Sequence, residues 1–307
     1  YKLAVAQRMI GIDANSIVLN DYPEKGSLSK KFLGDSLVWN GAEESVVELI
    51  KRYLVQADVI HIHNNISGEV LSFIKEYCSR AHFVYQVHSP LREGPLYWYR
   101  HESMGLPFAA FLVVSQYQPR HYLDYQPVPN IILDEPSVFL RKPGEPLKVL
   151  YSPSHTRNGR WNAKYSERLE AHIKNLHELN LIELVWPKKP LSPFELMGIR
   201  KFSHVSIDEI STGAYHQVSL EGLCAGNVVV NRADYFSKAM LANCATSHNM
   251  PPFLFADEAT IDSVLINLVN DYELTVKLQK ASFDYFRDNL APKDMAKIYK
   301  GIYDALV

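Results

Sequence analysis

The stretch Ser211-Thr-Gly-Ala-Tyr-His-Gln-Val-Ser-Leu-Glu-Gly-Leu-Cys-Ala-Gly226 is the most informative in the chain. It reads as a polar loop that enters a short helix at Gln217, with Glu221 inside the helix. Gly226 ends that helix just before an apolar strand at 228–230. A loop, a helix and a buried strand in this order are typical of a parallel α/β sheet.

The start of this helix also predicts a binding site. The backbone N–H groups near Gln217, Val218 and Ser219 favour a phosphate, because the helix dipole places partial positive charge there. Glu221, one turn later, is within reach of ribose hydroxyls. The alternative is a buried loop and helix with Glu221 facing solvent.

The rest of the chain continues the alternation of strands and helices, which predicts two successive doubly wound halves. Strands are predicted at 16–19, 58–63, 82–88, 111–115, 131–133, 147–151, 182–186, 205–207, 228–230 and 253–255. Helices are predicted at 1–12, 43–55, 68–78, 164–179, 193–202, 217–225, 261–269, 274–287 and 293–306. The polar stretch 141–146 is the predicted linker. A half of this kind should begin with a strand, so we expect an earlier strand ahead of the first helix.

Composition narrows the function classes. A chain of 307 residues is longer than one ordinary domain, which predicts two domains. Its composition, with 47% hydrophobic and 21% charged residues, is typical of a globular protein. A formal net charge of -2 gives no global positive field for nucleic acid. Cys78, Cys224 and Cys244 are far apart and are expected to be buried free thiols. Without a long apolar run or a visible signal peptide, we expect a cytoplasmic protein that does not insert stably into membranes.

A basic turn follows the first strand of the second half, in the segment 151–164. Ser154, Arg157, Arg160 and Lys164 lie in it, and fixed cations there would stabilise a departing nucleoside diphosphate. A solvated loop is the alternative. The pattern GxxxxGK is absent, which excludes a P-loop.

Histidines end two predicted strands of the first half. Alternation places His61 and His63 on one face of their strand, and His88 ends the next strand, where open α/β sheets bind ligands. No third ligand has zinc-motif spacing, so we predict no metal. His61 is interpreted as structural, whereas His88 is a candidate functional residue.

Together these segments resemble the donor-binding motifs of the large family four of retaining GT-B glycosyltransferases. In that family two glutamates separated by seven residues precede a helix end of this type. Glu221 matches the second glutamate, which there binds the ribose, whereas Gly213 stands at the first, which there contacts the transferred sugar. Asp208 and Glu209, just upstream, are the predicted substitutes. Lys164, with Arg157 or Arg160, matches the basic pair that neutralises the pyrophosphate.

The resemblance implies two Rossmann-like domains facing across a cleft. It divides the chain into an acceptor domain at 1–142, a donor domain at 143–288 and a terminal helix at 289–307 that crosses back. The implied activity is transfer of a sugar, with retention, from a nucleotide donor that is UDP-linked, without a further cofactor. His88, Gly213 and His216 would contact the sugar, and Ser154 would join the donor-binding residues.

Other functions remain open at this stage. The departure at Gly213 favours, as the main alternative, a sugar-nucleotide-binding or partner protein without turnover. A GT-B epimerase would need several carboxylates in the cleft, and a dehydrogenase would need a GxGxxG motif after a strand. The acceptor is undefined: carbohydrate, lipid, protein, a small thiol or a modified DNA base. The aromatic and basic segment 91–101 is a candidate acceptor wall or a packed loop.

Overall fold

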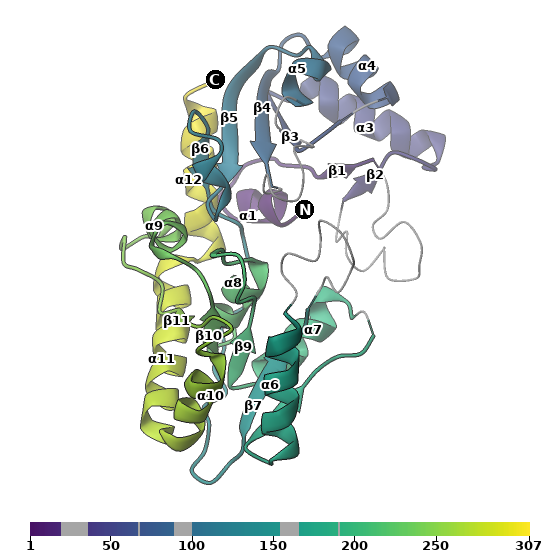
Figure 1. Ribbon diagram of the computed structural model, residues 1–307. Coiled ribbons are helices and arrows are strands. Elements are labelled where there is room, and N and C mark those ends of the chain that lie inside the picture. The colour runs from purple at the N-terminus through teal and green to yellow at the C-terminus, as the bar shows by residue number, and fades with distance from the viewer. Residues whose placement is uncertain (20–35, 67, 89–99, 154–165, 190) are drawn as a thin grey trace. The chain divides into compact units, whose positions relative to one another are not determined.

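The computed structural model describes residues 1–19, 36–66, 68–88, 100–153, 166–189 and 191–307. Two compact units make up the chain (Figure 1). Unit 1 combines Tyr1–Ile131 with Pro292–Val307, and unit 2 is the continuous segment Ile132–Ala291. The chain therefore leaves unit 1 once and returns to it with its last helix.

Unit 2 is built on a parallel sheet with the strand order β11-β10-β9-β7-β8. The strands are β7 (Leu147–Tyr151), β8 (Ile182–Val185), β9 (Val205–Ile207), β10 (Val228–Asn231) and β11 (Leu254–Phe255). The helices are α6 (Glu167–Glu178), α7 (Pro193–Lys201), α8 (Gln217–Cys224), α9 (Tyr235–Cys244), α10 (Ile261–Asn270) and α11 (Tyr272–Asn289). Parallel strands with crossover helices explain why these strands read as short apolar runs in the sequence.

The two faces of this sheet bury different kinds of side chain. Val205 and Ile207 of β9 belong to the apolar core that also includes Ile173 of α6 and Leu265 of α10. Because side chains alternate along a strand, Ser206 points to the opposite face, where α7 and α8 pack. A buried polar network of Arg200, Ser206 and Asn227 lies on the face that carries α8.

Unit 1 contains the parallel sheet β3-β4-β5-β6 and a separate pair of strands, β1 and β2, which are also parallel. Its strands are β1 (Ile17–Val18), β2 (Leu37–Val38), β3 (Val59–His63), β4 (His82–Val87), β5 (Phe108–Val114) and β6 (Gln126–Val128). Its helices are α1 (Lys2–Arg8), α3 (Glu44–Gln56), α4 (Gly68–Tyr77), α5 (Arg100–Met104), the 3-10 turn η2 (Gln118–Arg120) and α12 (Pro292–Asp304). Figure 1 shows α12, in yellow, packed beside α1.

The predicted α/β class is confirmed, with one strand misplaced. The strand predicted at 131–133 is wrong, since those residues are irregular, and the strand in this region is β6 at Gln126–Val128. Pro127 lies within β6, which is tolerated because β6 is the last strand of its sheet and one of its sides carries no ladder. The prediction followed the apolar residues and so passed over the strand that contains proline.

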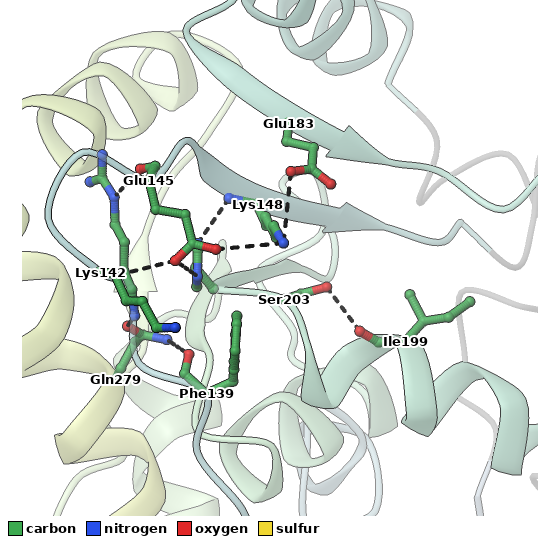
Figure 2. Close-up of polar contacts among 10 residues, drawn as sticks. Phe139, Lys142, Glu145, Lys148, Glu183, Ile199, Ser203 and Gln279 are labelled. Carbon is green, nitrogen blue, oxygen red and sulfur yellow. Dashed lines mark hydrogen bonds and ion pairs between the residues drawn. The ribbon is translucent and has the colours of Figure 1, made fainter.

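The segment from Ile132 to the start of β7 belongs to unit 2 and packs on its helices. The Arg141 guanidinium donates to the carbonyls of Leu268 and Val269 at 2.7 and 3.1 Å, near the C-terminal end of α10, where unsatisfied carbonyls attract cations. Gln279 Nε2 donates to the Phe139 carbonyl at 2.9 Å, a contact drawn in Figure 2. These bonds attach residues 139–141 to unit 2, which begins at Ile132, ahead of the linker predicted at 141–146.

Candidate functional site

The strand order of unit 2 creates a topological switch point. β7 and β9 are neighbours, yet the chain leaves β7 toward β8 on one side and leaves β9 toward β10 on the other. Ligands of open α/β sheets bind at the carboxyl ends of such strands. The residues that follow β9, from Asp208 to the start of α8, therefore form the candidate site.

Asp208 organises this loop from a buried position. Its carboxylate accepts hydrogen bonds from the His216 backbone N–H at 2.6 Å and from the Ser219 hydroxyl at 2.7 Å, and it lies 3.2 Å from His216 Nδ1. Burial alone would raise the pKa of Asp208, but the nearby His216 ring and these hydrogen bonds lower it. An ionised Asp208 thus ties the end of β9 to the first turn of α8.

Ser219 is bonded within the protein at both its hydroxyl and its backbone N–H. Its side chain is buried, its hydroxyl also accepts from Asn231 Nδ2 at 2.9 Å, and its backbone N–H donates to the His216 carbonyl at 3.0 Å. Its place among the donor-binding residues stays a prediction. Gln217 and Val218 provide the first two N–H groups of α8, which by helix geometry have no acceptor within the helix.

Glu209 does not fit the predicted substitute for the first glutamate. It is 2% exposed, and its carboxylate accepts from the backbone N–H groups of Ser211 and Thr212, both at 2.8 Å, as well as from the Thr212 hydroxyl. Asp208 is occupied in a similar way by His216 and Ser219. Both acids stabilise the loop from within.

Gly213 has a backbone conformation that requires glycine. Its φ is +82°, and a Cβ at this position would lie 3.3 Å from Asp234 Oδ2. The Gly213 carbonyl accepts from the Asp234 N–H at 3.1 Å and from the Ser237 hydroxyl at 2.9 Å, which fixes the loop to the start of α9. A side chain at this position would therefore strain the backbone as well as approach Asp234.

Glu221 lies one turn into α8, as predicted, and is held on two sides. Gln217 Nε2 donates to its Oε1 at 2.8 Å, and Arg200 Nη2 donates to its Oε2 at 3.2 Å. The Arg200 side chain is 0% exposed, whereas that of Glu221 is 13% exposed. Sequence reasoning missed Arg200, because an arginine in the last turn of a helix is ordinarily a solvated residue near the helix dipole.

Unit 1 brings three histidines together at the ends of β3 and β4. His63 Nδ1 and His88 Nε2 are 2.7 Å apart, and the His61 ring stacks on His63 with 4.3 Å between centroids. His61 Nδ1 lies 2.6 Å from the Tyr303 hydroxyl of α12. Desolvation by the surrounding protein lowers the pKa of His61 to about 3 and that of His88 to about 4. Desolvation and the two neighbouring rings also lower the pKa of His63, although that residue is exposed. His61 and His88 are therefore neutral near pH 7.

The backbone of His88 is fixed at both of its polar groups. Its N–H donates to Asn64 Oδ1 at 2.8 Å, and its carbonyl accepts from Gln118 Nε2 at 3.0 Å. Asn64 has φ +60°, a conformation that asparagine tolerates better than most residues. Sequence reasoning did not identify Asn64, Gln118 or Tyr303, because these contacts join distant segments.

Several predicted residues lie outside the described residues. These are Ser154, Arg157, Arg160 and Lys164 of the basic turn, together with 91–99 of the candidate acceptor wall. The described end of that wall belongs to a packed aromatic cluster: His101 Nδ1 is 3.2 Å from the Tyr125 hydroxyl, and its ring lies 5.0 Å from that of Phe111.

Further features bear on the remaining expectations. Cys78, Cys224 and Cys244 are buried free thiols, as predicted. Over the part of the chain that the structure describes, three or more His, Cys, Asp or Glu side chains nowhere gather in a group that could hold a metal ion. The described helices include none with the length and apolar character needed to cross a membrane.

Comparison with known proteins places the fold. An α-glucosyltransferase in complex with UDP and a 13-mer DNA containing a central A:G mismatch matches with a TM-score of 0.67 at 11% identity, over 99% of this chain and 95% of that chain. The Anabaena protein HepE in complex with UDP-glucose matches with a TM-score of 0.58 at 10% identity, over 94% of this chain and 98% of that one. No family model and no curated protein matches the chain.

A third solved structure, the GtfA/B complex, has a TM-score of 0.50 at 14% identity. The match covers 85% of this chain but only 60% of that one, so this chain spans less than two thirds of its length. Identities this low establish the fold and no more. The chain has the GT-B fold with its two Rossmann-like domains, as the sequence predicted.

Proposed function

We propose that this protein transfers a sugar from a UDP-linked donor to an acceptor hydroxyl, with retention of the anomeric configuration. The observation that carries the proposal is the position of Glu221, a carboxylate one turn into α8 at the switch point of unit 2, held by a buried arginine. A carboxylate in that position suits two neighbouring ribose hydroxyls. The solved structures of the same fold that contain UDP or UDP-glucose add support.

Each candidate residue then has a defined task. Glu221 binds the ribose, and the N–H groups of Gln217 and Val218 bind a phosphate at the start of α8. Lys164 with Arg157 or Arg160, together with Ser154, would hold the diphosphate. His88, Gly213 and His216 are assigned to the sugar. In this mechanism the leaving phosphate assists the incoming hydroxyl on the same face of the sugar, so that no protein nucleophile and no cofactor is needed.

The same proposal keeps the domain roles suggested by the family resemblance. The first half would bind the acceptor, the second half would bind the donor, and the protein would act in the cytoplasm without stable membrane insertion. The acceptor class stays open among carbohydrate, lipid, protein, a small thiol and a modified DNA base.

Donor hydrolysis tests the activity without a known acceptor, since water then takes the acceptor's place. The purified protein is incubated with UDP-glucose, UDP-galactose and UDP-N-acetylglucosamine, and the anomeric protons are followed by NMR. We expect one donor to be consumed, with release of UDP and a sugar whose first-formed anomer is α. A first-formed β anomer would exclude retention.

A second candidate function is a donor-binding protein without turnover, favoured by Gly213 and its backbone conformation. Calorimetry separates the two: binding of a UDP-sugar with no hydrolysis and no transfer supports this second function. If neither UDP nor any UDP-sugar binds, both functions are wrong.

A further inference from the structure

The carboxylate of Glu221 is paired with a guanidinium from the helix beside α8. Arg200, in the last turn of α7, donates from Nη2 to Glu221 Oε2 at 3.2 Å and from Nη1 to the Ser206 hydroxyl at 3.0 Å. The arginine is on the inner side of the pair and the glutamate on the outer, partly exposed side. The two terminal nitrogens of the planar guanidinium thus connect Glu221, the candidate ribose-binding residue, to the central strand β9.

This placement is unfavourable for the arginine itself. A guanidinium taken out of water loses its hydration, and Arg200 Nε has no hydrogen-bond partner among the described residues. Burial lowers the pKa of Arg200, while the negative charges of Glu221 and Asp208 oppose that shift, so the side chain stays a cation. Its position is understandable if its task is to fix the carboxylate.

The surroundings of Arg200 are built to hold it still. The Ser206 hydroxyl donates to Asn227 Oδ1 at 2.7 Å, and Asn227 Nδ2 donates to the Ser203 carbonyl at 2.6 Å and to the Arg200 carbonyl at 3.2 Å. Gly222 allows the close approach of α8, since a Cβ there would lie 2.8 Å from Val229 Cγ2. The network is fully buried and connects α7, β9 and the turn after α8.

The other oxygen of Glu221 has a partner that a ligand can replace. Gln217 Nε2 donates to Oε1 at 2.8 Å, and Gln217 is an exposed residue. A ribose hydroxyl that donates to Oε1 would displace the Gln217 amide, which can then bond to water at little cost in free energy. The Arg200 guanidinium is fully buried, so water cannot replace Glu221 Oε2 as its acceptor.

We infer that Arg200 is a positioning residue for nucleotide recognition: it holds Oε2 of Glu221 so that Oε1 receives the ribose hydroxyls, and it makes no contact with the ligand. This inference rests on the proposed function. It assigns to Arg200 the discrimination between ribose and deoxyribose, whereas the phosphates are bound elsewhere at the start of α8.

Calorimetric affinities for UDP, 2′-deoxy-UDP and 3′-deoxy-UDP test the inference. The wild type should prefer UDP over at least one deoxy analogue by about tenfold or more, the usual effect of a hydrogen bond to a charged group. In Arg200→Met and Arg200→Lys this ratio should fall below about threefold, while affinity for that deoxy analogue changes little. Lysine keeps the charge but lacks the fork that spans Glu221 and Ser206. Glu221→Gln should reproduce the loss, and Arg287→Lys, on the exposed face of α11, should not.

The outcomes separate this inference from the proposed function. If Arg200→Lys, folded by circular dichroism, loses affinity for UDP and its deoxy analogues in parallel, or loses none, Arg200 has no positioning role and nucleotide binding still stands. If the wild type binds UDP without ribose preference, the inference is wrong as well. If the wild type binds no nucleoside diphosphate at all, the proposed function fails and this inference fails with it. Arg200→Met alone is not decisive, because the loss of a buried ion pair can unfold the protein.

Discussion

His204 Nδ1 accepts a hydrogen bond from the backbone N–H of Lys148 at 3.0 Å, which fixes the proton of the neutral ring on Nε2. The ring is stacked on Phe139 with 5.6 Å between centroids, and its Nε2 is 3.7 Å from Glu145 Oε2. Figure 2 shows the Lys148 side chain between Glu145 and Glu183, with which it forms ion pairs. Protonation of Nδ1 would therefore break the bond to Lys148 inside unit 2.

This contact predicts a pH-dependent stability. Burial lowers the pKa of His204 to about 4, although Glu145 opposes the shift. His204 has a higher pKa in the unfolded chain, so the unfolded chain binds more protons. The free energy of unfolding therefore falls as the pH drops from about 6.5 toward 4, by about 3 kcal/mol in the limit. His204→Asn, whose amide oxygen can still accept from Lys148, should flatten this loss in urea unfolding measured at several pH values. Some pH dependence of the unfolding free energy should remain in this variant, because the pKa values of His61 and His88 are also lowered in the folded protein. An unchanged slope in the variant would contradict the assignment.

Replacing Gly213 by glutamate should cost stability because of the backbone conformation at this position. Gly213→Ala and Gly213→Glu should each destabilise the protein by about 1–2 kcal/mol, because φ +82° disfavours any side chain. The glutamate would also bring a negative charge toward Asp234. Chemical denaturation and donor hydrolysis measure both effects. A Gly213→Glu variant that is as stable as the wild type and more active would show that the loop path is not fixed.

Glu221→Ala should weaken UDP binding by about 10- to 100-fold, since hydrogen bonds from the ribose to a charged carboxylate are lost. Glu183→Ala is the matched control on β8, where the carboxylate is half exposed and makes only a 3.9 Å ion pair with Lys148. Equal affinities of the wild type and the Glu221→Ala variant would remove the central support for the donor site.

Asp208→Asn should loosen the start of α8 and lower stability at neutral pH by about 1–3 kcal/mol, because an ionised acceptor of three donors is lost. The pKa of Asp208 is lowered in the folded state, so its stabilisation is present above the unfolded value near 3.8 and disappears as the pH falls through the folded value. The difference between the wild type and the variant should therefore shrink at acid pH. A constant difference across that range would argue against an ionised Asp208.

His88→Ala should lower turnover by more than tenfold and leave UDP affinity within about twofold, because His88 is assigned to the sugar. His82→Ala is its matched control, since His82 begins the strand β4 that His88 follows. Steady-state kinetics with saturating donor give the first quantity and calorimetry gives the second. A loss of equal size in both variants would mean that unit 1 was merely destabilised.

The sequence predicted the α/β fold because buried parallel strands leave short apolar runs such as Val228–Val230, and because glycine marks the end of α8. The same glycine signal placed Glu221 within the helix α8. It missed α9, although Asp234 is a recognisable N-cap whose side chain accepts from Ser237 N–H at 2.9 Å. That capping signal would have revealed the helix.

The polar contacts of the site could not be predicted in the same way. Whether Arg200 faces water or Glu221 depends on how closely α7 and α8 approach the sheet, which a single sequence does not encode locally. The pairing of His63 with His88 joins two strands and depends on their register. Residue types and spacing thus identified candidates, whereas packing decided which of them are buried and bonded within the protein, as with Ser219.

The hydrogen bond between His61 and Tyr303 spans 242 positions of the chain. During synthesis on the ribosome, the whole of unit 2 therefore emerges before the histidine cluster of unit 1 acquires its tyrosine partner. Unit 2, being continuous, is the half that can complete its contacts first. A shortened chain that ends before Pro292 would leave unit 1 without α12 and His61 without its Tyr303 partner.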